Sequence, residues 1–142
     1  MLRLRGAHRD AMVATAIRAL PNEGCGLLVG RADDVVEVVP SPNVADSARV
    51  YEVDPRVLLR TFRDAEARGL EVIGVFHSHT HSAAYPSPTD VAQSPDPSWH
   101  YVLVSLAEAM SDVRSFRIVE GAISEEELAL EGEEGHDRLR YR

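Results

Sequence analysis

The sequence has one cysteine, no long hydrophobic run and no excess of basic residues. A single cysteine, Cys25, excludes an internal disulfide and fits a reducing cytoplasm. No apolar stretch approaches the roughly 20 residues that a membrane-spanning helix needs, and the N-terminus lacks the apolar core of a signal peptide. A net charge of −8 argues against nucleic-acid binding, which needs a basic face. We therefore expect a cytoplasmic protein without membrane or nucleic-acid partners.

Apolar spacing and turn residues predict a single domain, 1–142, that alternates helices and strands. Helical spacing covers 8–20, and Asp54-Pro55 marks the start of a second helix that stops near Gly69. Strands are predicted at 23–30, 35–39, 49–53, 70–76, 99–106, 113–119 and 122–124.

From residue 125 the chain is acidic and then rich in Gly, Asp and Arg, so we expect a solvated or frayed tail over 125–142. The pattern before it indicates the α/β (α+β) class, with one mixed β-sheet flanked by two main helices.

Three histidines at alternate positions follow the apolar run 72–76. Side chains two apart on a strand point to the same side, so His77 and His79 can face one metal ion. His81 extends the series, and spacing alone does not choose between the pairs His77/His79 and His79/His81. A bend in the chain after Thr80 would admit all three.

The segment from Ser87 to Asp90 is typical of a helix start, with Ser87 at the N-cap and Pro88 at the first helical position. An acidic residue in the first turn suits the helix dipole, and a carboxylate there is also a rigidly held ligand. Two histidines and one aspartate leave a fourth coordination position open, as in catalytic zinc sites. We expect one Zn²⁺ per chain, held by two histidines of this series and Asp90.

Glu23 by itself reads as a solvated carboxylate beside a turn, although at the head of a glycine-flanked strand it could reach a neighbouring strand. Together with His77-Ser78-His79 and, after a seven-residue gap, Ser87-x-x-Asp90, it resembles the motif of the JAMM (MPN+) zinc metalloproteases. That resemblance implies the JAMM/MPN, cytidine-deaminase-like fold over nearly the whole chain.

Segments that begin at Glu23, Phe76, Ala84 and Trp99 look more specifically like the bacterial Mec-type hydrolases. Those enzymes remove cysteine from the C-terminus of a ubiquitin-like sulfur-carrier protein during cysteine biosynthesis. Thr80 stands where deubiquitinating members usually carry proline, which favours the bacterial group. The implied partner is a sulfur carrier with a Gly-Gly C-terminus.

The resemblance also implies roles for single residues. His77, His79 and Asp90 would bind zinc, Glu23 would be the general base and then the general acid, and Ser87 would help to stabilise the oxyanion. From the residues alone, Ser87 can equally be a helix cap. His81 belongs to neither pattern; it and Tyr85 are candidate walls of the substrate groove.

Four other functions compete with this one. A general isopeptidase of the deubiquitinase type would use the same residues on another ubiquitin-like protein. A non-catalytic MPN scaffold would have lost ligand residues, and all are present here. A cysteine hydrolase would use Cys25, but a buried thiol beside a carboxylate has a raised pKa and is a poor nucleophile. A deaminase of the Cys-x-x-Cys zinc type needs more than one cysteine.

Overall fold

The computed structural model describes residues 1–131 of the chain. The strands are β1 (Leu2–Leu4), β2 (Cys25–Arg31), β3 (Asp34–Ser41), β4 (Glu71–His79), β5 (His100–Ser105), β6 (Asp112–Val119), β7 (Ala122–Glu126) and β8 (Leu128–Leu130), and the helices are α1 (Gly6–Ala19), α2 (Pro55–Ala67) and α3 (Pro88–Ala92). All strands join one 8-stranded sheet in the order β7-β6-β5-β4-β2-β3-β1-β8.

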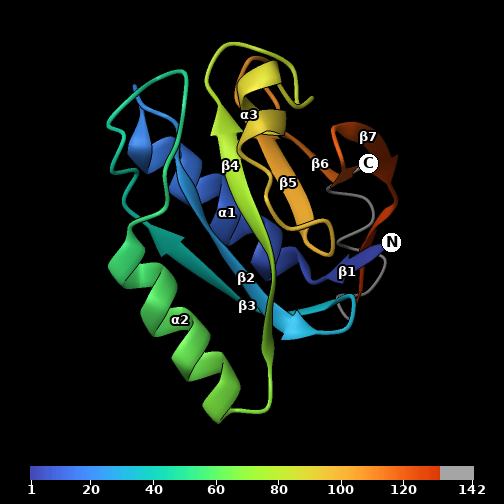
Figure 1. The fold of residues 1–142 in the computed structure, drawn as a ribbon. Helices are drawn as coiled ribbons and strands as arrows, with labels where there is room; N and C mark the ends of the chain where they lie inside the picture. The colour runs from blue at the N-terminus through green and yellow to red at the C-terminus, as the bar shows by residue number, and fades with distance from the viewer. Residues whose placement is uncertain (132–142) are drawn as a thin grey trace.

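The sheet is mixed, and β4 lies near its middle (Figure 1). Its neighbours are β2, which is antiparallel to it, and β5, which is parallel. The consecutive strands β2 and β3 form an antiparallel hairpin. Because β4 and β5 are parallel, their carboxyl ends meet at the same edge, where His79 pairs with Ser105.

One long helix covers each face of the sheet, which confirms the predicted fold class. The α1 helix packs against β2, β3, β4 and β5, and α2 packs against β2 and β4 (Figure 1). Strand side chains alternate between the two resulting cores, as the pleat requires. One core contains Leu28, Phe76 and Val102, and the other contains Leu27, Val75 and Tyr101.

The helix starts follow the predicted turn chemistry. The Asp54 carboxylate accepts a hydrogen bond from the Arg56 backbone N–H at 2.8 Å, and Pro55 occupies the first helical position of α2. The Ser87 hydroxyl oxygen accepts from the Asp90 N–H at 3.1 Å and caps α3. Beyond α2, Gly69 adopts a φ of +70°, which suits a residue without a side chain.

Two predictions about secondary structure are wrong. Residues 49–53 form no strand; an isolated bridge joins Asn43 to Val53. The Asn43 side chain takes the hydrogen bonds that a neighbouring strand would have used, with the Val50 carbonyl and the Glu52 N–H.

The predicted frayed tail is also wrong over 125–131, because these residues include the end of β7 and all of β8. The rest of that prediction, 132–142, lies outside the described residues. The short strand β1 was not predicted either; it pairs in parallel with both β3 and β8. Among residues 1–131, no helix has the length and apolar character needed to cross a membrane.

Candidate metal centre

His77 and His79 lie at the carboxyl end of β4, on the sheet face that α2 covers. They continue the line of Val75, and Ser78 points to the opposite face, where its hydroxyl accepts from the Gly24 N–H at 2.7 Å. Each histidine is 4% exposed. The strand therefore delivers two imidazoles side by side in a buried position, as the alternate spacing predicted.

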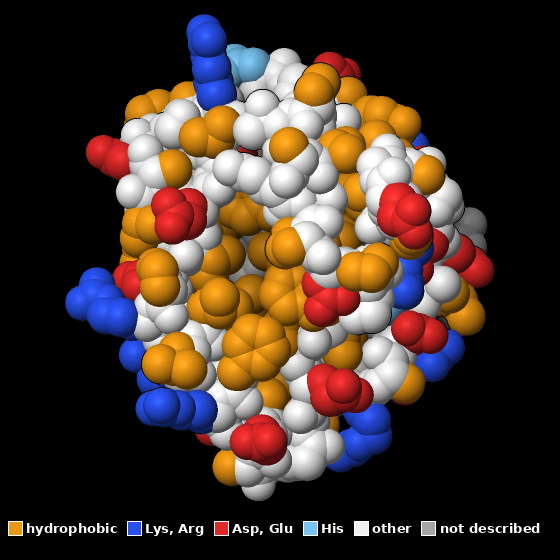
Figure 2. Space-filling model, viewed as in Figure 1, with side chains coloured by type: hydrophobic (Ala, Val, Ile, Leu, Met, Phe, Trp, Pro, Cys, Tyr) orange, Lys and Arg blue, Asp and Glu red, His pale blue; other side chains and the backbone are white. Residues whose placement is uncertain are grey.

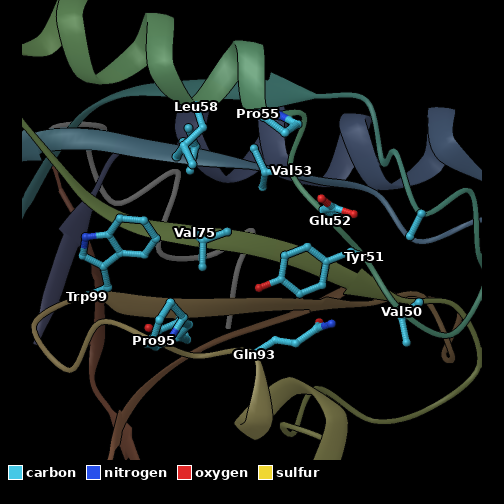
Figure 3. A pocket seen from close by; sticks show the side chains of 13 residues that line it. Val50, Tyr51, Glu52, Val53, Pro55, Leu58, Val75, Gln93, Pro95 and Trp99 are labelled. Atoms are coloured by element: carbon cyan, nitrogen blue, oxygen red, sulfur yellow. The ribbon is translucent and has the colours of Figure 1, made fainter.

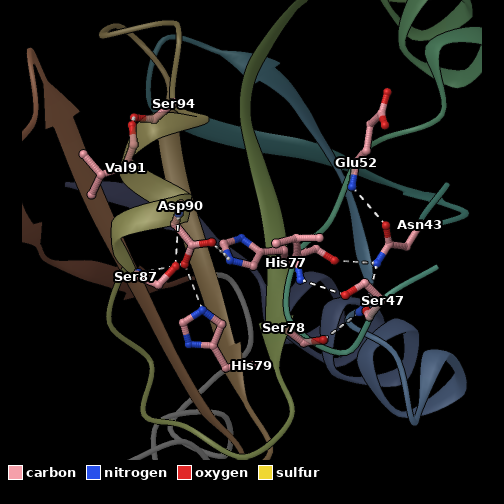
Figure 4. A network of polar contacts seen from close by, with 12 residues as sticks. Asn43, Ser47, Glu52, His77, Ser78, His79, Ser87, Asp90, Val91 and Ser94 are labelled. Carbon is pink, nitrogen blue, oxygen red and sulfur yellow. Dashed lines mark hydrogen bonds and ion pairs between the residues drawn. The ribbon is translucent and has the colours of Figure 1, made fainter. Parts of the chain in front are cut away.

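Asp90 faces both histidines from the first turn of α3 (Figure 4). Its Oδ1 lies 3.1 Å from His77 Nε2, and its Oδ2 lies 2.9 Å from His79 Nε2. One ligand atom from each of the three side chains falls within 4.8 Å of the others. The structure thus brings together the three predicted ligands in a group that could hold a metal ion.

Neighbouring groups fix the orientation of each member of this group. The His79 Nδ1 donates to the Ala83 carbonyl at 2.8 Å, which leaves Nε2 as the atom that faces Asp90. The His77 ring stacks on Tyr51 with a centroid distance of 4.1 Å. The Asp90 Oδ2 accepts from the Ser87 N–H at 2.9 Å.

Unpartnered atoms in the group fit a metal ion. His77 Nε2 is buried and has no hydrogen-bond partner among the described residues, although Asp90 Oδ1 lies 3.1 Å away. Glu23 Oε1 is also buried without a hydrogen-bond partner among the described residues. Imidazole nitrogens and a carboxylate oxygen are ordinary ligands of zinc.

Burial and mutual contacts shift the pKa values at the centre. Burial lowers the pKa of His77, which favours the neutral form that binds metals. Burial alone would lower the pKa of His79, but hydrogen bonds to Asp90 and Ala83 outweigh it and raise that pKa. Burial alone would raise the pKa of Asp90, but its contacts with both imidazoles outweigh it and hold the pKa well below the usual range.

Glu23 lies next to the centre although it is distant in sequence. It is 3% exposed and lines one pocket with His79 and Ser87. Burial is the largest cause that raises its pKa to about 7; the Asp90 charge raises it too, and His79 lowers it. Such a carboxyl group can both accept and return a proton near neutral pH.

The backbone of Glu23 is held in place on both sides. Its N–H donates to the Ser47 carbonyl at 2.9 Å, and its carbonyl accepts from Asn43 Nδ2 at 3.0 Å. At Gly24, an added Cβ would meet the α1 backbone at Ala16 at 3.0 Å, so the absence of a side chain lets the helix approach closely.

Sequence reasoning missed Asn43 and Tyr51. The Asn43 amide nitrogen donates to three carbonyls, those of Glu23, Ser47 and Val50, and its oxygen accepts from the backbone N–H groups of Ala45 and Glu52, as Figure 4 shows in part. An Asn in a Pro/Asn/Ser loop signals a turn, but nothing local to Asn43 points to Glu23. Tyr51 lay in the strand predicted at 49–53.

His81 and Tyr85 take different positions. Since β4 ends at His79, the chain turns away, and His81 is an exposed residue whose Nδ1 lies 2.9 Å from Thr80 Oγ1. It lines the pocket of Glu23 but is not in the three-ligand group. Tyr85 is 56% exposed, packs edge-on against Phe116 and does not line that pocket.

Cys25 is poorly suited to nucleophilic catalysis. It is fully buried, and burial raises the pKa of its thiol to about 12, with a further upward contribution from Glu23. Its sulfur lies 3.8 Å from the Ser41 carbonyl oxygen. A thiol in this environment stays protonated at neutral pH, which argues against a cysteine hydrolase.

An apolar hollow opens beside the centre (Figure 2). Figure 3 shows Val53, Leu58 and Trp99 around it. Tyr51 belongs to both places, because it lines the hollow and its ring also stacks on His77. One side chain therefore contacts both the hollow and the metal centre.

Known proteins resemble this chain over most of its length. The family model of prokaryotic homologues of the JAB domain matches residues 6–119. The CysO-cysteine peptidase of Mycobacterium tuberculosis is 39% identical over 129 residues, which is 89% of this chain and 88% of that protein. The probable TtuB-protein conjugate cleaving protease of Thermus thermophilus is 36% identical over 118 residues, 82% of this chain and 73% of that protein.

Solved structures agree with these matches. A protein of Desulfitobacterium hafniense is 39% identical, with a TM-score of 0.86 over 96% of this chain and 98% of that one. A structure described as a JAMM metalloprotease-like zinc site in the proteasome and signalosome has a TM-score of 0.59 at 20% identity, over 93% and 98% of the two chains, and shares the fold. Together with the site geometry, these matches show that the chain belongs to the family of prokaryotic homologues of the JAB domain.

Proposed function

We propose that this protein is a zinc metallopeptidase that hydrolyses the amide bond between the C-terminus of a ubiquitin-like sulfur-carrier protein and cysteine. The observation that carries the proposal is the convergence of His77, His79 and Asp90 beside a buried, unpartnered Glu23. Support comes from the relative named CysO-cysteine peptidase. A single buried cysteine fits a reducing compartment, and we propose a cytoplasmic location.

In this proposal, His77, His79 and Asp90 hold one zinc ion. When bound, zinc lowers the pKa of water and polarises a carbonyl oxygen, which addresses the weak nucleophile and the weak electrophile of amide hydrolysis. The burial of the three ligands and the stacking of Tyr51 on His77 favour a fixed orientation of these side chains.

Glu23 moves the proton. Its carboxylate accepts a proton from the attacking water, whose oxygen bonds to the amide carbon. Glu23 then donates that proton to the nitrogen of the leaving amino acid as the carbon–nitrogen bond breaks. The second proton of water leaves the new carboxyl group and is taken up by the amine, so the products are the carrier carboxylate and a free amino acid with a protonated amine, and atoms and charge balance without any further reactant.

The Ser87 hydroxyl can cap helix α3 and assist the reaction at the same time. A hydroxyl-oxygen lone pair accepts from the Asp90 N–H at 3.1 Å, and the hydroxyl proton remains free to donate to the tetrahedral oxyanion. The helix-cap interpretation and the oxyanion interpretation are therefore compatible.

A second candidate function is the cleavage of isopeptide conjugates of a ubiquitin-like protein. The observation in its favour is the similarity to a relative named as a probable TtuB-protein conjugate cleaving protease. The same metal centre would serve, and only the leaving group would differ, a lysine side chain in place of a C-terminal amino acid.

Mass spectrometry of a carrier–cysteine adduct incubated with the zinc-loaded protein tests the proposal. We expect the adduct to lose the mass of one cysteine and a chelator to block this loss. A parallel reaction with a carrier joined to a lysine side chain measures the alternative. An intact carrier–cysteine adduct alongside a cleaved isopeptide conjugate would replace the first function with the second.

A further inference from the structure

Arg49 lies at the pocket that contains Glu23. That pocket is lined by Glu23, His79 and Ser87 and also by Arg49 and His81. Arg49 is the one lining residue that carries a permanent positive charge, since arginine does not lose its proton in proteins. A cation thus lines the same pocket as the proposed general base, in a protein whose net charge is −8.

The guanidinium of Arg49 has no hydrogen bond or ion pair within residues 1–131, in contrast to several other arginines. Arg3, Arg56, Arg68 and Arg114 each pair with a carboxylate. The backbone N–H of Arg49, however, donates to Ser47 Oγ at 3.0 Å. The position of the residue is therefore fixed while its charged group stays available.

The loop that carries Arg49 is attached to the catalytic region. Asn43 donates to the carbonyl of Glu23 and to those of Ser47 and Val50, which flank Arg49 in the sequence. A side chain on this loop consequently keeps its place relative to Glu23. This is the arrangement needed to recognise a group next to the bond that is cleaved.

We propose that Arg49 binds the free α-carboxylate of the amino acid that leaves, and so selects substrates cleaved at a C-terminal residue. The inference rests on the proposed function. In such a substrate the carboxylate sits on the carbon that bears the scissile nitrogen, so its partner must lie close to the general base. The planar guanidinium matches a carboxylate through two parallel hydrogen bonds.

His81, which belongs to neither family pattern, supplies a second donor. When the Thr80 hydroxyl donates to Nδ1, the imidazole carries its proton on Nε2. That N–H can donate to the same carboxylate, because His81 lines the same pocket as Arg49. An isopeptide substrate has several methylene groups between its scissile nitrogen and the nearest backbone, and gives neither residue a charged partner there.

The experiment compares a carrier that ends in cysteine, the same carrier that ends in cysteinamide, and a carrier linked to a lysine side chain. The intact zinc-loaded protein should prefer the free carboxylate roughly tenfold or more in kcat/KM. In Arg49→Ala this preference should disappear, mainly through a higher KM, and Arg49→Lys should restore part of it. Arg60→Ala, which removes an exposed cation from α2, is the matched control and should behave like the natural protein.

A binding measurement separates this inference from the proposed function. The NMR signal of the Arg49 side-chain N–H should shift when L-serine is added and should not respond to ethanolamine, which lacks the carboxylate. If no carrier is cleaved but serine still shifts the signal, the proposed function fails and the carboxylate site stands. Equal cleavage of the acid and the amide, with an unresponsive Arg49 signal, overturns the inference.

Discussion

The position of Glu23 is set by residues that are distant from it in the sequence. Its carboxyl group is buried among the side chains of the metal centre, and its backbone is tied to Ser47 and Asn43. Both the side chain and the backbone of Glu23 are therefore held in place at the pocket. A single change of its carboxylate should affect proton transfer without moving the metal ligands.

We expect Glu23→Gln to retain zinc and to lower kcat by about 10²- to 10⁴-fold, because the amide cannot accept the proton of water. Elemental analysis measures the zinc and the carrier–cysteine assay measures kcat. Glu52→Gln, which changes an exposed carboxylate in the nearby loop, should leave both quantities unchanged. A Glu23→Gln protein with full activity would exclude Glu23 as the general base.

A site residue could be predicted from the sequence where the pattern that indicates it lies within a few residues. Strand alternation indicated a pair of histidines and a helix-start pattern indicated Asp90, and both signals act within a few residues. The choice of His77 and His79 within the series came from the motif resemblance. Glu23 shows no such signal, and only the motif resemblance pointed to it. Tyr51 reaches the centre by stacking on His77, a contact that exists only after the chain has folded.

At the scale of elements, the side chain of Asn43 holds the loop over 43–53 together. Asn43 makes five hydrogen bonds to the backbone, and these replace the ladder of the strand that the sequence predicted at 49–53. Alternating side chains signal a strand only if another strand is present to pair with it. Helix α2 was predicted well because its cap, Asp54, lies beside it in the sequence, and α1 was predicted from apolar spacing within the helix itself.

Asn43→Ala should loosen this loop. We expect a loss of about 1–3 kcal/mol in the free energy of unfolding, since backbone groups at the loop lose their partners. Hydrogen exchange should accelerate at the amides of Ala45 and Glu52, which donate to Asn43. Asn22→Ala serves as the control, because Asn22 contacts the same loop through one hydrogen bond at the surface, to Asp46. Unchanged exchange in Asn43→Ala would refute the role of Asn43.

At the scale of the whole molecule, the two edges of the sheet are joined. The edge strands β7 and β8 are separated by Glu127 alone, so the sheet curls until its edges approach. Glu126 stands at this junction and contacts His100 Nδ1 at 2.6 Å, Ser115 Oγ at 2.7 Å and the N-terminal amine at 3.1 Å. These contacts link segments from the start, middle and end of the described chain, and no local sequence pattern indicates them.

Glu126→Gln should destabilise the fold at neutral pH. Burial alone would raise the pKa of Glu126, but hydrogen bonds from His100 and Ser115 outweigh it and lower the pKa to about 2. The ionised carboxylate therefore stabilises the fold above about 4.5, the ordinary pKa, and this contribution is lost as the pH falls towards about 2. We expect a deficit of about 1.5–3 kcal/mol at pH 7 that shrinks across this range.

Chemical denaturation at a series of pH values measures that deficit. Glu125→Gln is the matched control, because Glu125 is the neighbouring carboxylate in β7 and pairs at 3.4 Å with Arg114 at the surface. Exposed pairs of this kind contribute little to stability. A deficit that stays constant from neutral pH to pH 2 would show that the charge of Glu126 plays no part.

The central position of β4 restricts how a substrate can approach. Both sides of this strand are occupied, since His77 pairs with Cys25 of β2 and with Leu103 of β5. An extended peptide cannot bind by adding itself as another strand alongside the histidines, a common mode of peptide recognition. Access to the histidines is instead from the carboxyl end of β4, where the pocket lined by Glu23, His79 and Ser87 lies.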